Sequence, residues 1–302
     1  MARGVTGLLG SAPPKRQVVV QTGPERRRTE RRGSRELLIN LTLREIRSQF
    51  KRTALGRLWS FINPLGTIAI YSLVFGFLLT QHIPAGTHSG ITLFTVFLAS
   101  ALIPWNFLSA GIMGGMGGIV NNGALLSKVY FPRYIPVVAT VLSAAFTFLM
   151  ELGVLVVVVA FVGGPKILLF IPLMLLMVFL MVIFVVGVAL ALSVAMVFFR
   201  DTQHFMALFM QIWLYLTPII YSIDTIIAKQ DALLKEGHDI PLRFLWGLNP
   251  AYRFTDAFRA MVYDYDIPRW QDWIGAAGWA GGALVVGLLV FRKFSSRLVE
   301  EL

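Results

Sequence analysis

Six long apolar stretches, set between arginine-rich ends, constrain this chain more than any other feature. They lie at about residues 59–80, 92–118, 134–162, 167–199, 204–221 and 272–292. Each is long enough to cross a ~30 Å hydrocarbon core as a helix, which takes at least about 17 residues. Because backbone polar groups in lipid must find partners within their own segment, helices are expected rather than strands. The sequence therefore predicts an all-α integral membrane protein with six transmembrane helices.

The composition supports this class and excludes others. Of the 302 residues, 56% are hydrophobic and only 14% are charged, whereas soluble domains carry about 25% charged residues. There is no cysteine, which excludes disulfides and Cys-ligated metals. The sequence also lacks a P-loop, an HExxH motif and a GxSxG motif, and its four histidines are scattered. We therefore expect no catalytic activity, metal or cofactor in this chain by itself.

The basic residues predict the orientation. With both termini in the cytoplasm, twenty of the 27 lysines and arginines lie on the inner side, and the loop at residues 81–90 has none. Because basic residues favour the cytoplasmic side, the pattern predicts cytoplasmic termini and an even number of crossings. Residues 1–33 contain seven arginines with Pro and Gly, and are expected to form a disordered basic tail against anionic lipid. The net charge of +11 thus indicates contact with membrane lipids and not with nucleic acid.

Residues 35–51 predict an amphipathic helix in the inner membrane interface. Ile39 and Ile46 belong to one apolar stripe, and basic side chains flank it at headgroup level. The alternative is a simple basic flank that orients the first span. Leu37 and Leu41 weaken this alternative, because they form a second apolar patch that is available to a protein partner.

The end of the second predicted span is rich in glycine. Gly111 with Gly115 and Gly114 with Gly118 are overlapping small-xxx-small pairs, which allow two backbones to approach closely. This pattern predicts either tight packing inside one bundle or a moving hinge.

Two segments between spans predict short helices. Residues 121–130 predict a short cytoplasmic helix that ends at Pro132. Residues 222–268 are too polar to span but carry apolar residues at amphipathic spacing. We expect two re-entrant helices there, dipping into the outer leaflet and broken around residues 248–250, where protein or a wet cavity must shelter the break. A solvated outer loop with two surface helices is the alternative.

Glu151 is the one ionisable residue deep in the third predicted span. Placing a carboxylate there costs at least about 2.5–3.5 kcal/mol on insertion scales, so it should face the bundle interior or a watery path. Glu151 is therefore expected either to line or gate a polar conduit, or to pair with Gln211 or His204 of the fifth span. A protonated or hydrogen-bonded packing residue is the alternative.

Six motifs, read in order, resemble one known family. They are LGRLWSFINPL (55–65), IPWNFLS (103–109), LLSKVYFPRYIP (125–136), FFRDTQH (198–204), LTPIIYS (216–222) and LNPAYRFTDAFR (248–259). Together they resemble the transmembrane subunit of ABC-2-type polysaccharide exporters, the family that moves lipid-linked O-antigen, teichoic acid and related glycans. The resemblance runs from about Arg35 to the end of the chain.

The resemblance implies a homodimer of six-span subunits in the bacterial plasma membrane, working with two copies of a separate ATPase that binds the ATP and Mg. It also implies two outer gate helices within 222–268. The residues expected to couple to the ATPase are Asn121, Leu125, Leu126, Lys128, Tyr130, Arg200, Asp201 and His204. The conduit or gate residues are then Glu151, Trp105, Tyr215, Tyr221, Trp246 and Tyr252. The basic residues expected to attract the diphosphate of a lipid-linked glycan are Arg44, Arg47, Lys51 and Arg57.

Other functions remain open at this point. An exporter of a drug or a smaller lipid in the same superfamily is the first alternative. A membrane-embedded transferase would need acidic clusters for a metal diphosphate, and Asp264 with Asp266 is the nearest pair, on the outer side. A scaffold subunit without transport is the third alternative. High Gly, Ala and Val content is typical of an actinobacterial source and, by analogy, favours a lipid-linked galactan.

Overall fold

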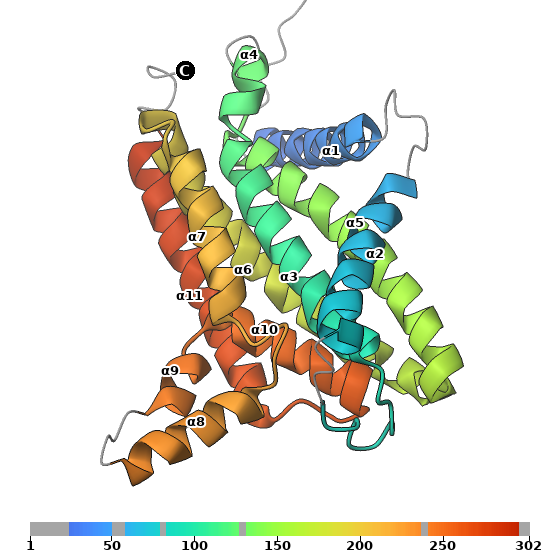
Figure 1. Ribbon diagram of the computed structural model, residues 1–302. Helices are drawn as coiled ribbons and strands as arrows, with labels where there is room; N and C mark the ends of the chain where they lie inside the picture. The colour runs from blue at the N-terminus through green and yellow to red at the C-terminus, as the bar shows by residue number, and fades with distance from the viewer. Residues whose placement is uncertain (1–23, 50–57, 79–82, 127–130, 237–240, 296–302) are drawn as a thin grey trace, which may run out of the picture.

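The computed structural model describes residues 24–49, 58–78, 83–126, 131–236 and 241–295, and the regular elements in these ranges are all helical. Figure 1 shows their arrangement. The α-helices are α1 (Pro24–Gln49), α2 (Trp59–Tyr71), α3 (Phe94–Gly117), α4 (Gly123–Leu126), α5 (Tyr134–Gly163), α6 (Ile171–Phe198), α7 (Thr202–Leu216), α8 (Ile223–Lys235), α9 (Leu242–Gly247), α10 (Pro250–Arg259) and α11 (Trp270–Phe294). The other helical segments are two π-helical ones at Ser72–Leu78 and Ala260–Asp264, and two 3-10 ones at Val120–Asn122 and Pro165–Phe170.

Four of the described helical segments are long and apolar enough to cross a membrane. These are α3, α5, α11, and α6 together with the 3-10 segment before it. The chain is therefore a multi-pass membrane protein. The other two predicted spans also coincide with helices: α2 continues through the π-helical segment to Leu78, and α7 has 15 residues. At 1.5 Å per residue α7 is about 22 Å long, shorter than a full hydrocarbon core.

Helix α7 ends before the predicted boundary at residue 221. Its last residue is Leu216, and Thr217 is extended, with φ −98° and ψ 131°. The next residue, Pro218, disfavours the helical conformation of the residue before it and has no N–H to donate. The hydrophobic stretch therefore continues past the helix, into a turn that leads to α8.

Helix α3 lies at the centre of the bundle and contacts α2, α5, α6, α7 and α10. Its glycines make this packing possible. A Cβ added to Gly111 would lie 2.7 Å from Cγ1 of Val185 in α6, and one added to Gly115 would lie 2.7 Å from Cβ of Ala189. Both distances are shorter than real Cβ contacts allow, so the glycine pairs support close packing inside one bundle rather than a hinge.

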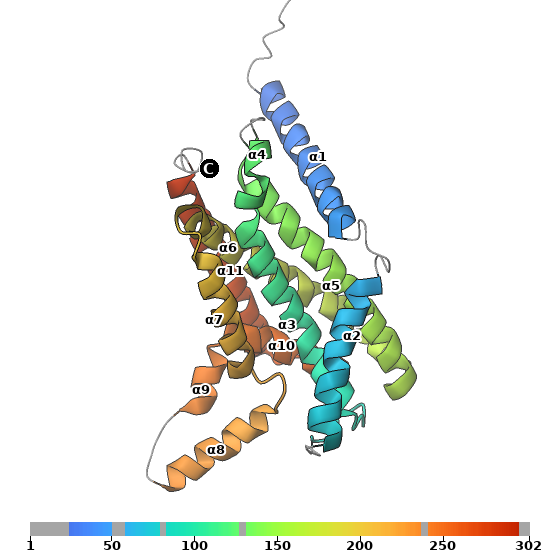
Figure 2. The ribbon, with the colours of Figure 1, turned by 45° about the horizontal axis from the view of Figure 1, so that its top comes forward.

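Helix α1 lies across one end of the bundle, which we call the α1 end (Figures 1 and 2). It starts earlier than the predicted residue 35, at Pro24, a residue suited to a first helical turn. Leu41 is buried against the start of α5, with Leu37 partly buried beside it, and Ile46 is buried as well. The second apolar patch, Leu37 and Leu41, thus packs against α5 of the same chain and not against a partner protein, whereas Ile39 of the first stripe stays exposed. Residues 24–33, predicted to belong to a disordered basic tail, are thus part of this helix, and the rest of that tail, residues 1–23, lies outside the described residues.

The opposite end, which we call the α8 end, is formed by the loop at residues 83–93 and by α8, α9 and α10 (Figure 1). The predicted break is present, because α9 ends at Gly247 and α10 begins at Pro250. The described part of the segment holds three α-helices, α8, α9 and α10, where two helices were expected. Helix α10 buries Phe254 and Phe258 and packs on α3 and α11, whereas no residue of α8 is buried and α8 packs on α9. A solvated surface loop therefore does not describe α10.

Candidate functional site

At the α1 end, the interface helix is tied to the turn after α3. Arg44 of α1 donates from Nη2 to the side-chain oxygen of Asn122, and Asn122 donates from Nδ2 to Gly118 O over 2.9 Å. Arg44 and Arg47 are both exposed. The other two residues of the predicted diphosphate site, Lys51 and Arg57, lie outside the described residues.

The two predicted coupling segments lie at this same end (Figure 1). The first is the α3–α4 region, in which Asn121 is exposed and Leu125 packs partly on the α1–α5 cluster. The second is the α6–α7 turn, in which Arg200, Asp201 and His204 are exposed. Lys128 and Tyr130 lie outside the described residues, as does the side chain of Leu126. The described parts of both segments thus lie at the same end of the bundle.

Near the α8 end, a hydrogen-bonded network joins α7 to the break before α10. Trp213 donates its indole N–H to Oδ1 of Asn249 over 2.8 Å, and Asn249 donates from Nδ2 to Oγ1 of Thr217 over 3.1 Å. The same Asn249 oxygen accepts the backbone N–H of Ala251 over 3.0 Å, as an N-cap does. Trp105 of α3 is buried edge-on against Trp213, with ring centroids 5.7 Å apart. One asparagine therefore fixes both the end of α7 and the start of α10.

This network lines an aromatic cleft of about 570 Å³ between α7 and α9. Its lining residues are Phe209, Trp213, Leu216, Leu245, Trp246, Leu248, Asn249 and Pro250. Tyr215 is exposed on α7, and Tyr221 donates its hydroxyl to Tyr215 O over 3.0 Å. Of the predicted conduit residues, Trp105, Tyr215, Tyr221 and Trp246 are thus gathered around or next to the end of α7.

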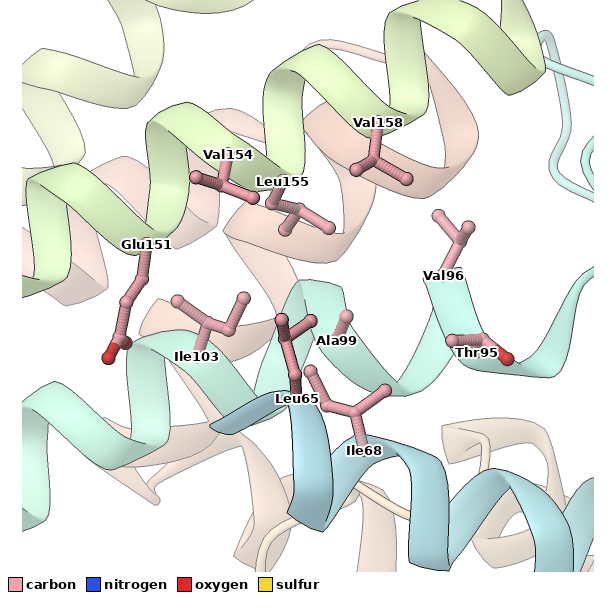
Figure 3. A pocket seen from close by; sticks show the side chains of 10 residues that line it. All are labelled: Leu65, Ile68, Thr95, Val96, Ala99, Ile103, Glu151, Val154, Leu155 and Val158. Carbon is pink, nitrogen blue, oxygen red and sulfur yellow. The ribbon is translucent and has the colours of Figure 1, made fainter. Parts of the chain in front are cut away.

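Glu151 lies elsewhere, on the side of α5 that faces α2 and α3. It lines two cavities. The first, of about 350 Å³, extends toward Glu45 of α1 and includes Asn106, Thr140 and Thr147. The second, of about 90 Å³, is a slot between α2, α3 and α5 that is apolar except for Glu151 and Thr95. Figure 3 shows the second cavity, with Glu151 at one end of the row of side chains.

The predicted pairing of Glu151 with the fifth span is absent from the described structure. His204 and Gln211 are exposed on α7, and they line neither of the cavities that contain Glu151. Among the described residues no hydrogen bond or ion pair to Glu151 is formed. The polar groups nearest to its half-buried carboxylate are therefore those that line the larger of these two cavities, which extends toward Glu45.

A polar cavity of about 340 Å³ lies at the α8 end, between α10, the loop at residues 83–93 and the start of α11. Arg259 is 6% exposed in its wall and donates to the carbonyls of Pro218 and Ile219, each over 2.8 Å. Its guanidinium carbon lies 3.9 Å from the ring centroid of Phe97. Tyr263, which also lines this cavity, donates to Pro84 O over 3.0 Å.

The acidic residues of this cavity differ in their surroundings. Asp272 forms an ion pair with Arg253 over 2.6 Å, and Asp264 accepts the N–H of Thr87 over 3.2 Å. Burial raises the pKa of Asp256 to about 6, although Arg259 and a hydrogen bond with Tyr252 favour its charged form. Burial also raises the pKa of Asp264. Asp256 is thus a carboxylate whose charge is costly to maintain.

The profile of the ABC-2 type transporter family matches residues 36–263. The chain belongs to this family. An O-antigen export system permease protein RfbA of Myxococcus xanthus is 28% identical over 235 residues, which cover 78% of this chain and 83% of that protein. A protein of the same name from Klebsiella pneumoniae is 28% identical over 270 residues, covering 88% and 95%. A second K. pneumoniae protein of this name is 26% identical over 270 residues.

Within this ABC-2 family chain, sequence reasoning located some site residues and missed others. It named aromatic conduit residues that the structure brings together near the end of α7, but it gave no role to Asn249, Asp256 or Arg259, although all three stand in the quoted motif at 248–259. The available signal was the pair of opposite charges at i and i+3 in a helix that buries its other face. Tyr252, predicted as a gate residue, lies in the wall of the polar cavity and not in the aromatic cleft.

Proposed function

We propose that this chain is the membrane-spanning subunit of an ATP-driven exporter of lipid-linked polysaccharide in the bacterial plasma membrane. The observation that carries the proposal is the extended likeness to O-antigen export permeases, which covers 88% of this chain and 95% of one relative. The six motifs quoted above all fall inside the family match at residues 36–263. The substrate would be a glycan on an undecaprenyl- or decaprenyl-type diphosphate, such as O-antigen, teichoic acid or galactan.

The proposed orientation puts the α1 end in the cytoplasm and the α8 end outside. Six crossings then follow from the four long helices together with α2 and α7. Helix α1 would lie in the inner interface, with Ile39 toward lipid and Arg44 and Arg47 at headgroup level. Exposed guanidinium groups at that depth are suited to attract the diphosphate of the lipid carrier. Lys51 and Arg57 are proposed to extend this basic surface.

The open face of α7 supports a path shared with a second copy of the chain. Helix α7 buries only Met206 and Met210 among its residues. Its exposed positions include His204, Gln211 and Tyr215, which follow one another along one side of the helix at 7- and 4-residue spacing. Polar side chains are costly against lipid tails. We therefore place this stripe and the aromatic cleft toward the partner copy, where glycan passes between the two subunits.

The energy would come from two copies of a separate ATPase, which bind the ATP and Mg. Both coupling segments, the α3–α4 region and the α6–α7 turn, lie at the proposed cytoplasmic end. The α3–α4 region is joined to α1 through Arg44 and Asn122, and the α6–α7 turn leads directly into α7. Closure of the ATPase pair would therefore move the interface helix and the path-lining helix together.

The test is reconstitution of this chain with and without the partner ATPase in proteoliposomes. Alone, the chain should neither hydrolyse ATP nor move a lipid-linked glycan; with the ATPase, glycan should become accessible on the α8 side when ATP is added. The triple variant Arg44→Gln, Arg47→Gln and Lys51→Gln should lower glycan export while leaving assembly with the ATPase intact. Transport of drugs or short lipids, with no transport of intact glycan, would instead identify the alternative exporter class.

A further inference from the structure

The polar cavity at the α8 end has the size and wall chemistry of a ligand site. Its volume of about 340 Å³ falls in the range of small-molecule pockets, which begins near 300 Å³. Its wall combines carboxylates, guanidinium groups, tyrosine hydroxyls and the ring of Phe97. This cavity is distinct from the aromatic cleft between α7 and α9, because the two have no lining residue in common.

Most of the acidic groups in the wall already have partners in the protein. Asp272 is paired with Arg253, Asp264 accepts from Thr87 N, and Asp266 accepts from Ile267 N over 2.8 Å. Asp256 differs, because its partner is the hydroxyl of Tyr252, a group that can also turn toward a ligand. A carboxylate has about four acceptor positions, so Asp256 keeps capacity for further donors.

Arg259 brings the opposite charge one helical turn away. It is held by Pro218 O, Ile219 O and the Phe97 ring, and these contacts fix it in place before any ligand arrives. Its Nε is buried and has no hydrogen-bond partner among the described residues. Each terminal nitrogen carries a second N–H besides the one given to Pro218 O or Ile219 O, and this N–H can serve an oxygen brought in by a ligand.

The two charges together select the class of ligand. A small cation attracted by Asp256 would be repelled by Arg259, and an anion would meet the reverse arrangement. A neutral polyhydroxyl compound suits both, because each hydroxyl can donate to the carboxylate and accept from the guanidinium. A sugar ring also offers an apolar face to the tyrosine rings of the wall.

The position of the cavity connects it to the proposed path. Helix α10 separates it from the aromatic cleft: Asn249 and Pro250 line the cleft, and Tyr252 and Asp256 line the cavity. We propose that this cavity binds a neutral saccharide unit of the exported glycan on the outer side of the membrane. This inference rests on the proposed function, since it takes the ligand from the transported substrate and the side from the proposed orientation.

The absence of cysteine from the sequence allows a clean labelling test. Ile267 lines the cavity and is 64% exposed, and Leu234 of α8 is 56% exposed without lining it. Ile267→Cys and Leu234→Cys are made separately in the chain assembled with its ATPase in nanodiscs, without ATP. Each is reacted with a membrane-impermeant maleimide in the presence of a β-linked galactose disaccharide. Labelling of Ile267→Cys should slow at least threefold at saturating sugar, and labelling of Leu234→Cys should not change.

Second substitutions in the Ile267→Cys background locate the effect. Asp256→Asn and Tyr252→Phe should each remove the protection by sugar, whereas Asp231→Asn, an exposed carboxylate of α8 outside the cavity, should keep it. Three results would each overturn the inference. Labelling of Leu234→Cys could slow as much as that of Ile267→Cys, or the protection could survive Asp256→Asn and Tyr252→Phe. The third is protection by ethanolamine but by no neutral sugar. If no sugar protects while the proteoliposomes still export glycan, the inference fails and the proposed function stands. Protection without any ATP-driven glycan movement would count against the proposed function alone.

Discussion

Gly187 of α6 and Gly287 of α11 face each other with their backbones in direct contact. A Cβ built on Gly287 would lie 2.1 Å from the carbonyl oxygen of Gly187, and one built on Gly187 would lie 2.4 Å from the backbone of Ala283. No side chain can be placed at either position without moving a helix. The α6–α11 pair is correspondingly the most extensive helix contact of the described bundle, and it anchors the last long helix to the rest.

The first prediction follows from this contact. Gly287→Ala should destabilise the protein, because the methyl group forces α6 and α11 apart, and overpacking of this kind typically costs about 1–3 kcal/mol. Thermal unfolding of the purified chain in detergent measures the effect. Gly281→Ala in the same helix is the control, since nothing lies within 4 Å of its Cβ position. It should be neutral or stabilising, because alanine is the better helix former. Equal melting of the two variants would contradict the packing argument.

The contrast between predicted and unpredicted features has a physical basis. Hydropathy located the helices because, in lipid, the backbone N–H and C=O groups of each segment must form hydrogen bonds within that segment, whatever lies next to it. The glycine pairs at residues 111–118 were visible because their spacing is local. The Gly187–Gly287 contact joins residues far apart in the sequence, and no local pattern records which faces meet. The end of α7 at Leu216 was missed for another reason: hydropathy continues through Pro218, although the backbone cannot.

The candidate site shows the same division. The sequence left several roles open for Glu151, one of which was a pairing with Gln211 or His204 of the fifth span, and the structure turns this residue toward α2 and α3. A helix periodicity gives the angle of a residue around its own axis, and says nothing of which neighbour stands at that angle. The polar cavity was missed because Arg259 and Phe97 come from α10 and α3, which meet only in three dimensions.

Asn249 carries the second prediction. Asn249→Ala removes the acceptor for Trp213 and for the N-cap of α10, and it removes the donor to Thr217. Losing an N-cap alone costs about 0.5–2 kcal/mol, so a lower melting temperature and reduced glycan export are expected. Asn249→Asp keeps the acceptor and the cap but loses the donated bond, and it should melt between the wild type and Asn249→Ala. Melting of Asn249→Asp at or below Asn249→Ala would refute the assignment of the cap.

Access to Glu151 is expected from one side of the membrane. The larger cavity extends from Glu151 toward Glu45 at the α1 end, and the slot beyond Glu151 is almost entirely apolar. A water-soluble thiol reagent should therefore modify Glu151→Cys from the α1 side and not from the α8 side. Vesicles of the two orientations separate these cases. Val158→Cys, which lines the slot alone, should resist the reagent from both sides, and its ready modification would show that the slot is wet.

Replacement of Glu151 tests whether this carboxylate takes part in transport. Glu151→Leu removes the polar end of the cavity, and glycan export should fall several-fold while ATPase assembly is retained. Glu151→Gln keeps the shape and the hydrogen-bonding capacity, so it should retain more export than Glu151→Leu. Export at the wild-type rate in Glu151→Leu would leave the residue with a packing role only.

The raised pKa of Asp256 predicts a pH-dependent cost to stability. Burial raises this pKa from its usual 3.8 to about 6, with Asp272 acting in the same direction and Arg259 and Tyr252 opposing it. The folded state therefore holds the proton more tightly than the unfolded state, and the stability this provides at low pH is lost as the pH rises from about 4 to about 6. Asp256→Asn, which is neutral at every pH, should match the wild type in melting temperature near pH 4 and exceed it at pH 7.5. The thermal unfolding of both proteins across this range is the measurement.

A wild type that remains the more stable of the two at pH 7.5 would mean that attraction to Arg259 outweighs the cost of burial. The expected result would instead fit a carboxylate retained for ligand binding at a cost in stability.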